Sequence, residues 1–235
     1  MICRNYVKRG TDRMKLVSIL GDSVSTFRGY NPPGYSVFYD QNMQRVNGLN
    51  SVSDTWWAMV IQNMHARLCV NNSYSGSRVT GEAFPSCACE ERLRNLGRQE
   101  DVPDYILIYA GFNDFGSGTE LVSSLDTYGF EDSYDLMLKT IRQYYPLAKI
   151  VCGTLMRTEI KGMPDWQFPE YWAGIGLEYY NDVIRWAAQE NQCFLADLGM
   201  GTAQYETLDG SHPTAQGHKT IAARWLECLA GLEII

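Results

Sequence analysis

The stretch Leu16-Val17-Ser18-Ile19-Leu20-Gly21-Asp22-Ser23-Val24-Ser25 decides the fold of this chain. Its first five residues form an apolar run with little alternation, which is typical of a strand buried on both faces of a parallel sheet. The run ends in a glycine, a carboxylate and a hydroxyl, which favour a tight turn. A serine just beyond the carboxyl end of such a strand lies where open α/β sheets bind ligands. Ser23 is therefore either a helix cap or a reactive hydroxyl, and this stretch alone favours neither.

Four more strand-like segments follow, and helical segments separate them. The strands are expected at residues 68–73, 104–110, 149–155 and 193–198. The helices are expected at residues 54–65, 90–96, 134–145, 176–190 and 214–229. This alternation is typical of crossover units between parallel strands. It predicts an α/β fold, with an open, mostly parallel sheet of five strands and helices on both of its faces.

The composition of the 235 residues is that of a globular protein with a core of its own, since 45% of them are hydrophobic. The formal net charge of -7 argues against a nucleic-acid partner and against binding to an anionic membrane surface. No targeting or membrane-spanning segment is evident. We expect residues 14–235 to form one domain behind a weakly structured N-terminal extension at residues 1–13. A cytoplasmic location is the default expectation.

Metal chemistry is not expected. The chain has seven cysteines, an odd number that does not suit a framework of disulfides. Most of them lie in apolar runs, which is typical of core residues in a reducing compartment. Cys87 and Cys89 lack a second pair of ligands at zinc spacing. Asp22 and Asp114 would suit a metal-dependent phosphoesterase, but three scattered histidines supply too few ligands for one. We therefore predict no metal and no other cofactor.

Polar turns lie at the ends of several predicted strands or lead into the last helix. The turns are Asp22-Ser23, Ser75-Gly76, Gly111-Phe112-Asn113-Asp114 and Asp209-Gly210-Ser211-His212. Because the ends of parallel strands converge at one edge of a sheet, these turns are expected to lie close together. They supply a hydroxyl, an imidazole, carboxylates, a glycine amide and a carboxamide. Nucleophilic acyl transfer requires these groups.

The hydroxyl of Ser23 is a weak nucleophile unless a base removes its proton, and we expect His212 to be that base. Asp209 stands three residues before His212, where its carboxylate can hold the imidazole tautomer and stabilise the imidazolium. The other two histidines, His65 and His218, lie in predicted helices and are expected to be structural.

The oxyanion formed on attack needs preorganised hydrogen-bond donors. The candidates are the backbone N–H groups of Ser23 and Gly76 and the side-chain amide of Asn113. A glycine at position 76 lets the backbone approach a ligand closely. Asp22 and Asp114 are expected to support the loops by accepting hydrogen bonds from backbone N–H groups.

The segment Gly21-Asp22-Ser23-Val24 resembles the Gly-Asp-Ser-Leu signature of the SGNH (GDSL-type) esterase and lipase superfamily. Gly76, Gly111-x-Asn113-Asp114 and Asp209-x-x-His212-Pro213 match its other blocks in order. Valine for leucine at position 24 is a minor apolar change. The resemblance implies a flavodoxin-like, three-layer α/β/α sandwich. It also implies a Ser23–His212–Asp209 triad and an oxyanion hole of Ser23, Gly76 and Asn113.

The function that follows is a serine esterase, which hydrolyses a small-molecule ester of a short acyl group through an acyl-enzyme. The chain has no Gly-x-Ser-x-Gly elbow, which argues against the ordinary α/β-hydrolase arrangement. An acyltransferase with the same acyl-enzyme and a short-chain lipase or thioesterase remain as alternatives. A catalytically silent binding module is a third, although the intact residue set argues against it. Two aromatic-rich loops, residues 26–53 and 156–172, are expected to form the pocket walls and to fit an acetylated carbohydrate or a short lipid or aryl ester.

Overall fold

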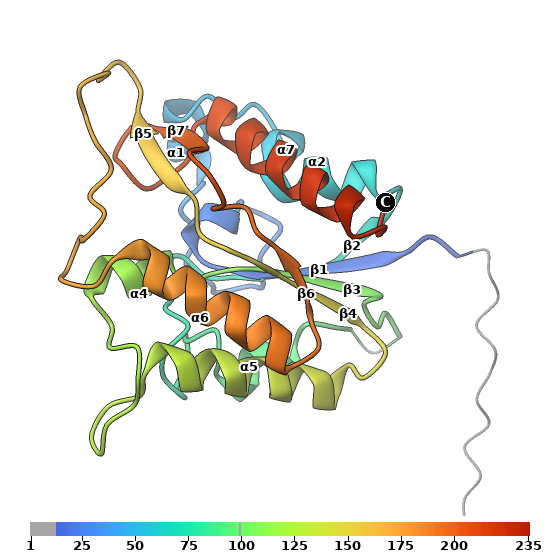
Figure 1. The fold of residues 1–235 in the computed structure, drawn as a ribbon. Helices are drawn as coiled ribbons and strands as arrows, with labels where there is room; N and C mark the ends of the chain where they lie inside the picture. Colours follow the sequence, from blue (N-terminus) through green and yellow to red (C-terminus); the bar gives the residue numbers. More distant parts are fainter. Residues whose placement is uncertain (1–12, 99) are drawn as a thin grey trace, which may run out of the picture.

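A parallel five-stranded sheet forms the centre of the protein (Figure 1). The computed structural model describes residues 13–98 and 100–235, so the expected extension lies outside the described residues except for Arg13. The strands are β1 (Leu16–Gly21), β2 (Arg67–Ser73), β3 (Tyr105–Tyr109), β4 (Lys149–Gly153) and β6 (Phe194–Ala196). Their order across the sheet is β2-β1-β3-β4-β6, and every neighbouring pair is parallel. All six residues of β1 are buried, as the unbroken apolar run predicts.

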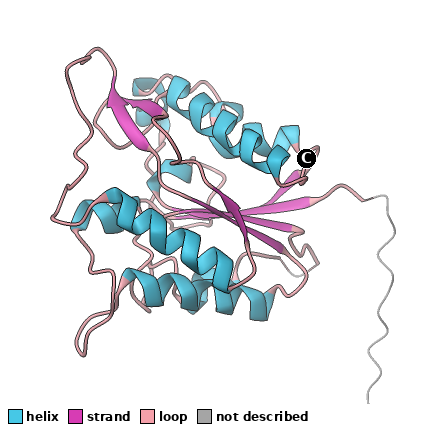
Figure 2. Cartoon of the chain, in the orientation of Figure 1, coloured by secondary structure: helices cyan, strands magenta, loops and turns pink. Residues whose placement is uncertain are grey.

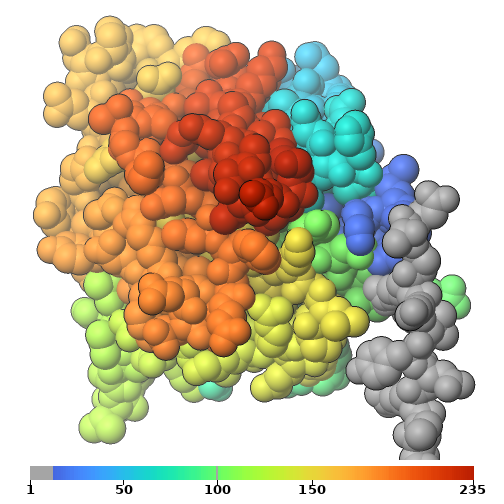
Figure 3. All heavy atoms as spheres, turned by 45° about the vertical axis from the view of Figure 1, so that its right-hand side comes forward, coloured from blue at the N-terminus to red at the C-terminus, as the bar shows by residue number. Residues whose placement is uncertain are grey.

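Helices cover both faces of the sheet (Figure 2). On one face, α2 (Trp56–Asn63) packs against α7 (Ala215–Gly231). On the other face, α5 (Phe130–Tyr144) packs against α3 (Glu90–Arg94) and α6 (Leu177–Glu190). Figure 3 shows α7 in red and α6 in orange where both reach the surface. The three layers and the strand order confirm the predicted flavodoxin-like α/β/α sandwich.

Helical periodicity explains why these segments pack on the sheet. The residues of α5 that are buried recur every three or four positions, and they include Phe130, Tyr134, Met137, Leu138 and Ile141. This helix begins at Phe130, earlier than the predicted residue 134. In the opposite layer, the fully buried rings of Trp56 and Trp225 stack with their centroids 5.3 Å apart. That stack joins α2 to α7 over the sheet.

A second, two-stranded sheet was not predicted. Strand β5 (Arg157–Ile160) pairs in parallel with β7 (Gln204–Thr207). The loop expected at residues 156–172 therefore begins with a strand. Both strands are four residues long and largely polar, so neither carries enough alternation to be recognised as a strand.

The loop expected at residues 26–53 also contains regular structure. It holds α1 (Gln41–Val46), which Asp40 caps, and a one-turn 3-10 helix at Val52–Asp54. Another short helix, α4 (Phe112–Ser117), begins within a turn that the sequence marks as polar. Among the helices that the structure describes, none has the length and apolar character needed to span a bilayer.

Candidate active site

The carboxyl edge of the sheet carries the residues that the sequence singles out. Asp22 and Ser23 follow β1 directly, and Ser23 opens a one-turn 3-10 helix. Gly76 lies in the turn after β2, and Asn113 lies in the first turn of α4 after β3. The chain adds β2 on one side of β1 and then adds β3, β4 and β6 on the other side, so the strand order changes direction between β1 and β3. Open α/β sheets bind ligands in the crevice at this point.

Ser23, His212 and Asp209 form a continuous chain of polar contacts. The Oγ of Ser23 lies 3.0 Å from Nε2 of His212, which is 189 residues away in the sequence. The other ring nitrogen of His212, Nδ1, lies 2.7 Å from Oδ2 of Asp209. Oδ1 of Asp209 accepts the backbone N–H groups of Ser211 at 2.9 Å and of His212 at 2.8 Å. The same carboxylate therefore shapes the turn and contacts the imidazole.

The small second sheet holds this turn in place. On β5, the Thr158 hydroxyl donates to the carbonyl of Gly210 at 2.8 Å. On β7, the Tyr205 hydroxyl donates to the carbonyl of Ser211 at 3.0 Å. Gly210 has a φ of 86°, a conformation that favours glycine. Strands β5 and β7, which were not predicted from the sequence, thus hold the segment that carries His212 through these hydrogen bonds.

Phe38 contacts the imidazole from a third direction. Its ring stacks on that of His212, with centroids 3.4 Å apart and 5° between the planes. The Phe38 backbone N–H donates to Oγ1 of Thr26 at 3.0 Å, and the Thr26 hydroxyl donates to the carbonyl of Ser23 at 2.9 Å. The first aromatic loop is thereby tied to the turn that bears Ser23. The sequence marks Phe38 only as one of several aromatic residues in that loop.

Gly76 and Asn113 line an open cavity of about 380 Å³ beside the histidine turn. The Nδ2 of Asn113 donates one hydrogen to the carbonyl of Ser77 at 2.9 Å, which leaves its second N–H available. Gly76 has a φ of 81°, and a Cβ built there would meet no atom within 4 Å. Ser211 and Trp172 also line the cavity. The second aromatic loop thus contributes a wall, whereas the described residues of the first loop contribute none here.

Burial and hydrogen bonding set the charges of two carboxylates near the histidine. Partial burial favours a higher pKa for Asp209, but the hydrogen bonds from His212 and Ser211 outweigh it and lower the pKa to about 2. Asp22 is buried, and this raises its pKa to about 6 despite the N–H of Val24, which donates to its Oδ1 at 3.0 Å. Asp209 is therefore fully ionised at neutral pH, and Asp22 is a weaker acid.

Asp114 joins the turn after β3 to the turn after β2. Its Oδ2 accepts the backbone N–H of Val79 at 2.7 Å, and its Oδ1 accepts the N–H and hydroxyl of Thr80 at 3.2 and 2.8 Å. Burial raises the pKa of Asp114, and these hydrogen bonds oppose the rise. The carboxylate fixes the segment that follows Gly76 relative to the helix that carries Asn113.

Arg92 lies fully buried next to the serine turn, although nothing in its local sequence marks it as a buried residue. Its guanidinium donates to the backbone carbonyls of Gly21 at 2.8 Å, Asn72 at 2.6 Å and Pro85 at 2.7 Å. It also donates to the side-chain Oδ1 of Asn72 at 3.2 Å. A planar group with five donors can connect β1, β2 and the following loop at once.

The other two histidines have no contact with this chain of residues. The Nδ1 of His218 in α7 accepts the backbone N–H of Trp56 at 3.2 Å, so it caps the first turn of α2. Burial lowers the pKa of His218 to about 3. His65 follows α2 on the surface with a φ of 48°. Within the described part of the chain, no group of three or more histidine, cysteine or acidic side chains is placed to hold a metal ion.

A family model for GDSL-like lipases and acylhydrolases matches residues 15–165. This chain is a member of that family. Membership indicates a hydrolase that acts on esters, and it agrees with the resemblance noted in the sequence. The match ends before the turn that bears His212, so the histidine is placed by the sequence motif and the geometry.

Two solved structures of proteins described as GDSL-like lipases are similar to this GDSL-like hydrolase. One, from Bacteroides ovatus, is 25% identical with a TM-score of 0.73 over 94% of this chain and 100% of that chain. Another, from Bacteroides uniformis, is 27% identical with a TM-score of 0.71 over 93% and 96% of the two chains. A family two carbohydrate esterase from Clostridium thermocellum, solved in complex with cellohexaose, shares the fold. It is 17% identical with a TM-score of 0.57, and the match covers 94% of this chain and 65% of that chain. A search of curated proteins found no match.

Proposed function

We propose that this GDSL-like hydrolase cleaves an ester of a small acyl group, with Ser23 as nucleophile, His212 as general base and Asp209 as the partner of the imidazole. The observation that carries the proposal is the unbroken chain of contacts, 3.0 Å from Ser23 Oγ to His212 Nε2 and 2.7 Å from Nδ1 to Asp209 Oδ2. Both distances suit direct proton transfer and charge stabilisation.

The reaction follows from these roles. Nε2 of His212 takes the proton of Ser23 Oγ while the oxygen attacks the ester carbonyl carbon. The resulting imidazolium then protonates the leaving alkoxide, and the acyl group stays on Ser23. A water molecule, deprotonated by the same nitrogen, attacks the acyl-enzyme; the acid leaves as the imidazolium returns its proton to Ser23 Oγ, which restores the free enzyme. Asp209 stays ionised throughout, because its pKa of about 2 lies far below neutral pH.

The tetrahedral intermediates carry an oxyanion that needs fixed donors. We assign this role to the backbone N–H groups of Ser23 and Gly76 and to Nδ2 of Asn113. The hydrogen bond from Asn113 to the Ser77 carbonyl supports the assignment, since it orients the amide and leaves one N–H free. The open space at Gly76 supports it as well, because a ligand atom can approach the backbone there.

A small acetyl or similar ester of a carbohydrate is the substrate class that we favour. The cavity of about 380 Å³ is small, and its walls combine polar groups with the rings of Phe112 and Trp172. Trp172 is 44% exposed and lines the cavity, so its side chain can contact a sugar ring. The carbohydrate esterase from Clostridium thermocellum supports the choice only in that the same fold carries such an activity there.

The test is hydrolysis of 4-nitrophenyl acetate and of acetylated sugars by the wild type and by Ser23→Ala. We expect the variant to lose turnover while its circular dichroism spectrum is unchanged. Ser53→Ala, which alters an exposed serine outside the candidate triad and the cavity lining, should retain full activity. An alkyl fluorophosphonate should label Ser23 in the wild type and leave Ser23→Ala unlabelled. Turnover by Ser23→Ala at the wild-type rate would exclude the mechanism.

Added alcohols separate hydrolysis from acyl transfer, because both reactions pass through the same acyl-enzyme. If the protein is a hydrolase, the acid should remain the main product when acceptor alcohols are present. A transesterified product in excess of the acid would assign the protein to the acyltransferases instead.

A further inference from the structure

Three cavities adjoin one another at the catalytic edge, and we call them together the trough. The first is the cavity at Gly76 described above. The second, of about 330 Å³, shares Arg78 and Ser117 with the first. The third, of about 580 Å³, shares Thr127 and Tyr128 with the second. Because neighbouring cavities share wall residues, they form a row from Gly76, Asn113 and Ser211 at the catalytic edge to α5.

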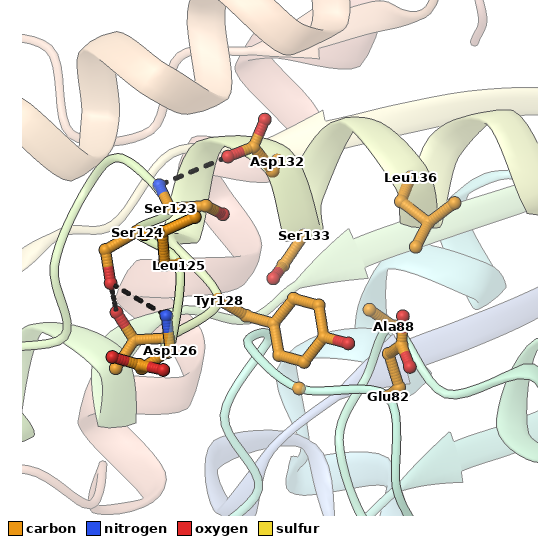
Figure 4. A pocket seen from close by; sticks show the side chains of 12 residues that line it. Glu82, Ala88, Ser123, Ser124, Leu125, Asp126, Tyr128, Asp132, Ser133 and Leu136 are labelled. Carbon is orange, nitrogen blue, oxygen red and sulfur yellow. Dashed lines mark hydrogen bonds between the residues drawn. The ribbon is translucent and has the colours of Figure 1, made fainter.

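Tyr128 is the central feature of the third cavity. Figure 4 shows its ring between Ser133 and Leu136 of α5 and the segment that carries Glu82 and Ala88. Tyr128 is 53% exposed and lines both the second and the third cavity, so its side chain can contact a ligand there. With Trp172 in the first cavity, an exposed aromatic side chain stands at each end of the trough.

The walls of the trough combine polar and apolar groups, and most of their charged side chains are acidic. Besides Tyr128, the residues with carboxylates or hydroxyls that line the second and third cavities are Glu82, Glu120, Asp126, Asp132, Thr80, Thr119, Thr127, Ser117, Ser123, Ser124 and Ser133. Among the described residues that line the trough, Arg78 is the one cation. An extended polyanion would meet four carboxylates, which would repel it.

A long acyl chain is also a poor match for the trough. Burying a hydrocarbon chain is favourable only against apolar walls. In the described chain, no aliphatic side chain other than methyl groups of threonine lines the second cavity, although Leu125 and Leu136 line the third. A fatty tail that started at Ser23 would therefore have to cross a polar section before it reached apolar contacts.

We propose that the trough binds the sugar chain of an acylated oligosaccharide. The ester lies at the catalytic end, and the chain runs past Arg78 to a ring that stacks on Tyr128. Sugar hydroxyls donate to the carboxylates and accept from Arg78 and from the serine and threonine hydroxyls. The flat face of a pyranose ring suits an exposed tyrosine. This proposal rests on the esterase function above and adds a dependence of activity on chain length.

The experiment uses gluco- and xylo-oligosaccharides of one to five units, each with a single acetyl group on a terminal sugar at either end. The readout is the ratio of kcat/KM for the longest chain to kcat/KM for the monosaccharide ester. In the wild type we expect this ratio to reach about tenfold or more in one series, since each 1.4 kcal/mol of added binding gives tenfold. Tyr128→Ala should lower the ratio by about fivefold, the size of effect typical of one aromatic contact.

Two controls keep the test specific. Tyr179→Ala alters an equally exposed tyrosine on α6 that does not line the trough, and it should leave the length ratio unchanged. Tyr128→Trp preserves an aromatic face and should retain the ratio, which separates stacking from a general effect on the loop. A ratio near one in every series would overturn the proposal, even with normal hydrolysis of 4-nitrophenyl acetate.

A second outcome would also overturn the proposal. If kcat/KM for 4-nitrophenyl esters rises steadily with acyl chain length, and Tyr128→Ala abolishes the rise, the trough holds an acyl chain. Failure of the esterase function itself has a different signature, because wild-type protein would then release no nitrophenol from any ester. The two failures are therefore distinguishable.

Discussion

The Phe38 ring lies parallel to the imidazole of His212, with the two centroids 3.4 Å apart. The imidazole is thus restrained by Ser23 at one nitrogen, by Asp209 at the other and by an aromatic ring on one face. It becomes a cation when it takes the serine proton, and the face of an aromatic ring attracts a cation. Phe38 therefore restrains the plane of the base, and its ring face lies where it can attract the charge that the imidazole gains during the reaction.

Replacing Phe38 with leucine should lower kcat for 4-nitrophenyl acetate by about tenfold, because the attraction between a ring face and a cation is lost while apolar volume is kept. KM should change little, since Phe38 does not line the cavity at Gly76 and Asn113. Phe38→Trp keeps an aromatic face and should restore most of the rate. Phe84→Leu changes an exposed phenylalanine elsewhere and serves as the control. An unchanged kcat in Phe38→Leu would show that the stack has no catalytic effect.

Asn113→Ala should lower kcat by about a hundredfold or more, because loss of one oxyanion donor removes stabilisation that exists only in the transition state. Asn113→Asp keeps the shape of the side chain but replaces a donor with a negative charge, so we expect a larger loss of kcat. Steady-state kinetics on 4-nitrophenyl acetate measure both. If Asn113→Ala raised KM and left kcat intact, the amide would be a ground-state binding group instead.

The five strands of the central sheet and the contact between Asp209 and His212 were predictable because their signals are local. Five apolar runs predicted the strands, three of these runs ended in polar turns, and parallel topology brought those turns to one edge. Ser23 alone was ambiguous, because serine is also a usual helix cap. Ser23, Asp209 and His212 were singled out together because their turns supply complementary groups and match the blocks of a known family in order. Asp209 and His212 also lie three residues apart, so their contact follows from the sequence alone.

Other features could not be read from the sequence because their contacts are distant. Phe38 stands in a long loop, and nothing local shows that its ring meets a residue near the far end of the chain. Arg92 sits in the run Glu-Glu-Arg-Leu-Arg, which reads as a solvated helix face, yet its side chain is fully buried. Strands β5 and β7 are short and polar and depend on each other. Only the folded chain reveals these partners.

Arg92→Leu should reduce the free energy of unfolding by about 3 kcal/mol or more, because buried carbonyl oxygens lose charged donors. Three backbone carbonyls accept from this guanidinium, including that of Gly21 beside the serine turn. Chemical denaturation at pH 7 measures the change. Arg94→Leu, two residues along the same helix and exposed, should leave the denaturation midpoint almost unchanged. Equal midpoints for the two variants would contradict the buried role of Arg92.

The buried His218 should make the stability of the fold depend on pH. Burial lowers its pKa to about 3 from an ordinary value of 6.5, so the folded protein keeps it neutral while the unfolded chain takes up a proton. The contribution of neutral His218 to the free energy of unfolding is therefore complete above pH 6.5, and it is lost progressively as the pH falls towards 3. His218→Asn retains an acceptor for the Trp56 N–H but does not titrate. Between pH 7 and pH 4, the wild type should therefore lose about 3 kcal/mol more stability than this variant.

The measurement is urea denaturation of both proteins at several pH values, with the difference between them plotted against pH. His65→Asn is the matched control, because His65 is exposed and its positive φ of 48° suits asparagine. That variant should follow the wild-type curve. Parallel curves for the wild type and His218→Asn from pH 7 to pH 4 would mean that the folded protein accommodates the protonated imidazole. The contact with the first turn of α2 would then have to open in acid, since a protonated Nδ1 cannot accept the Trp56 N–H.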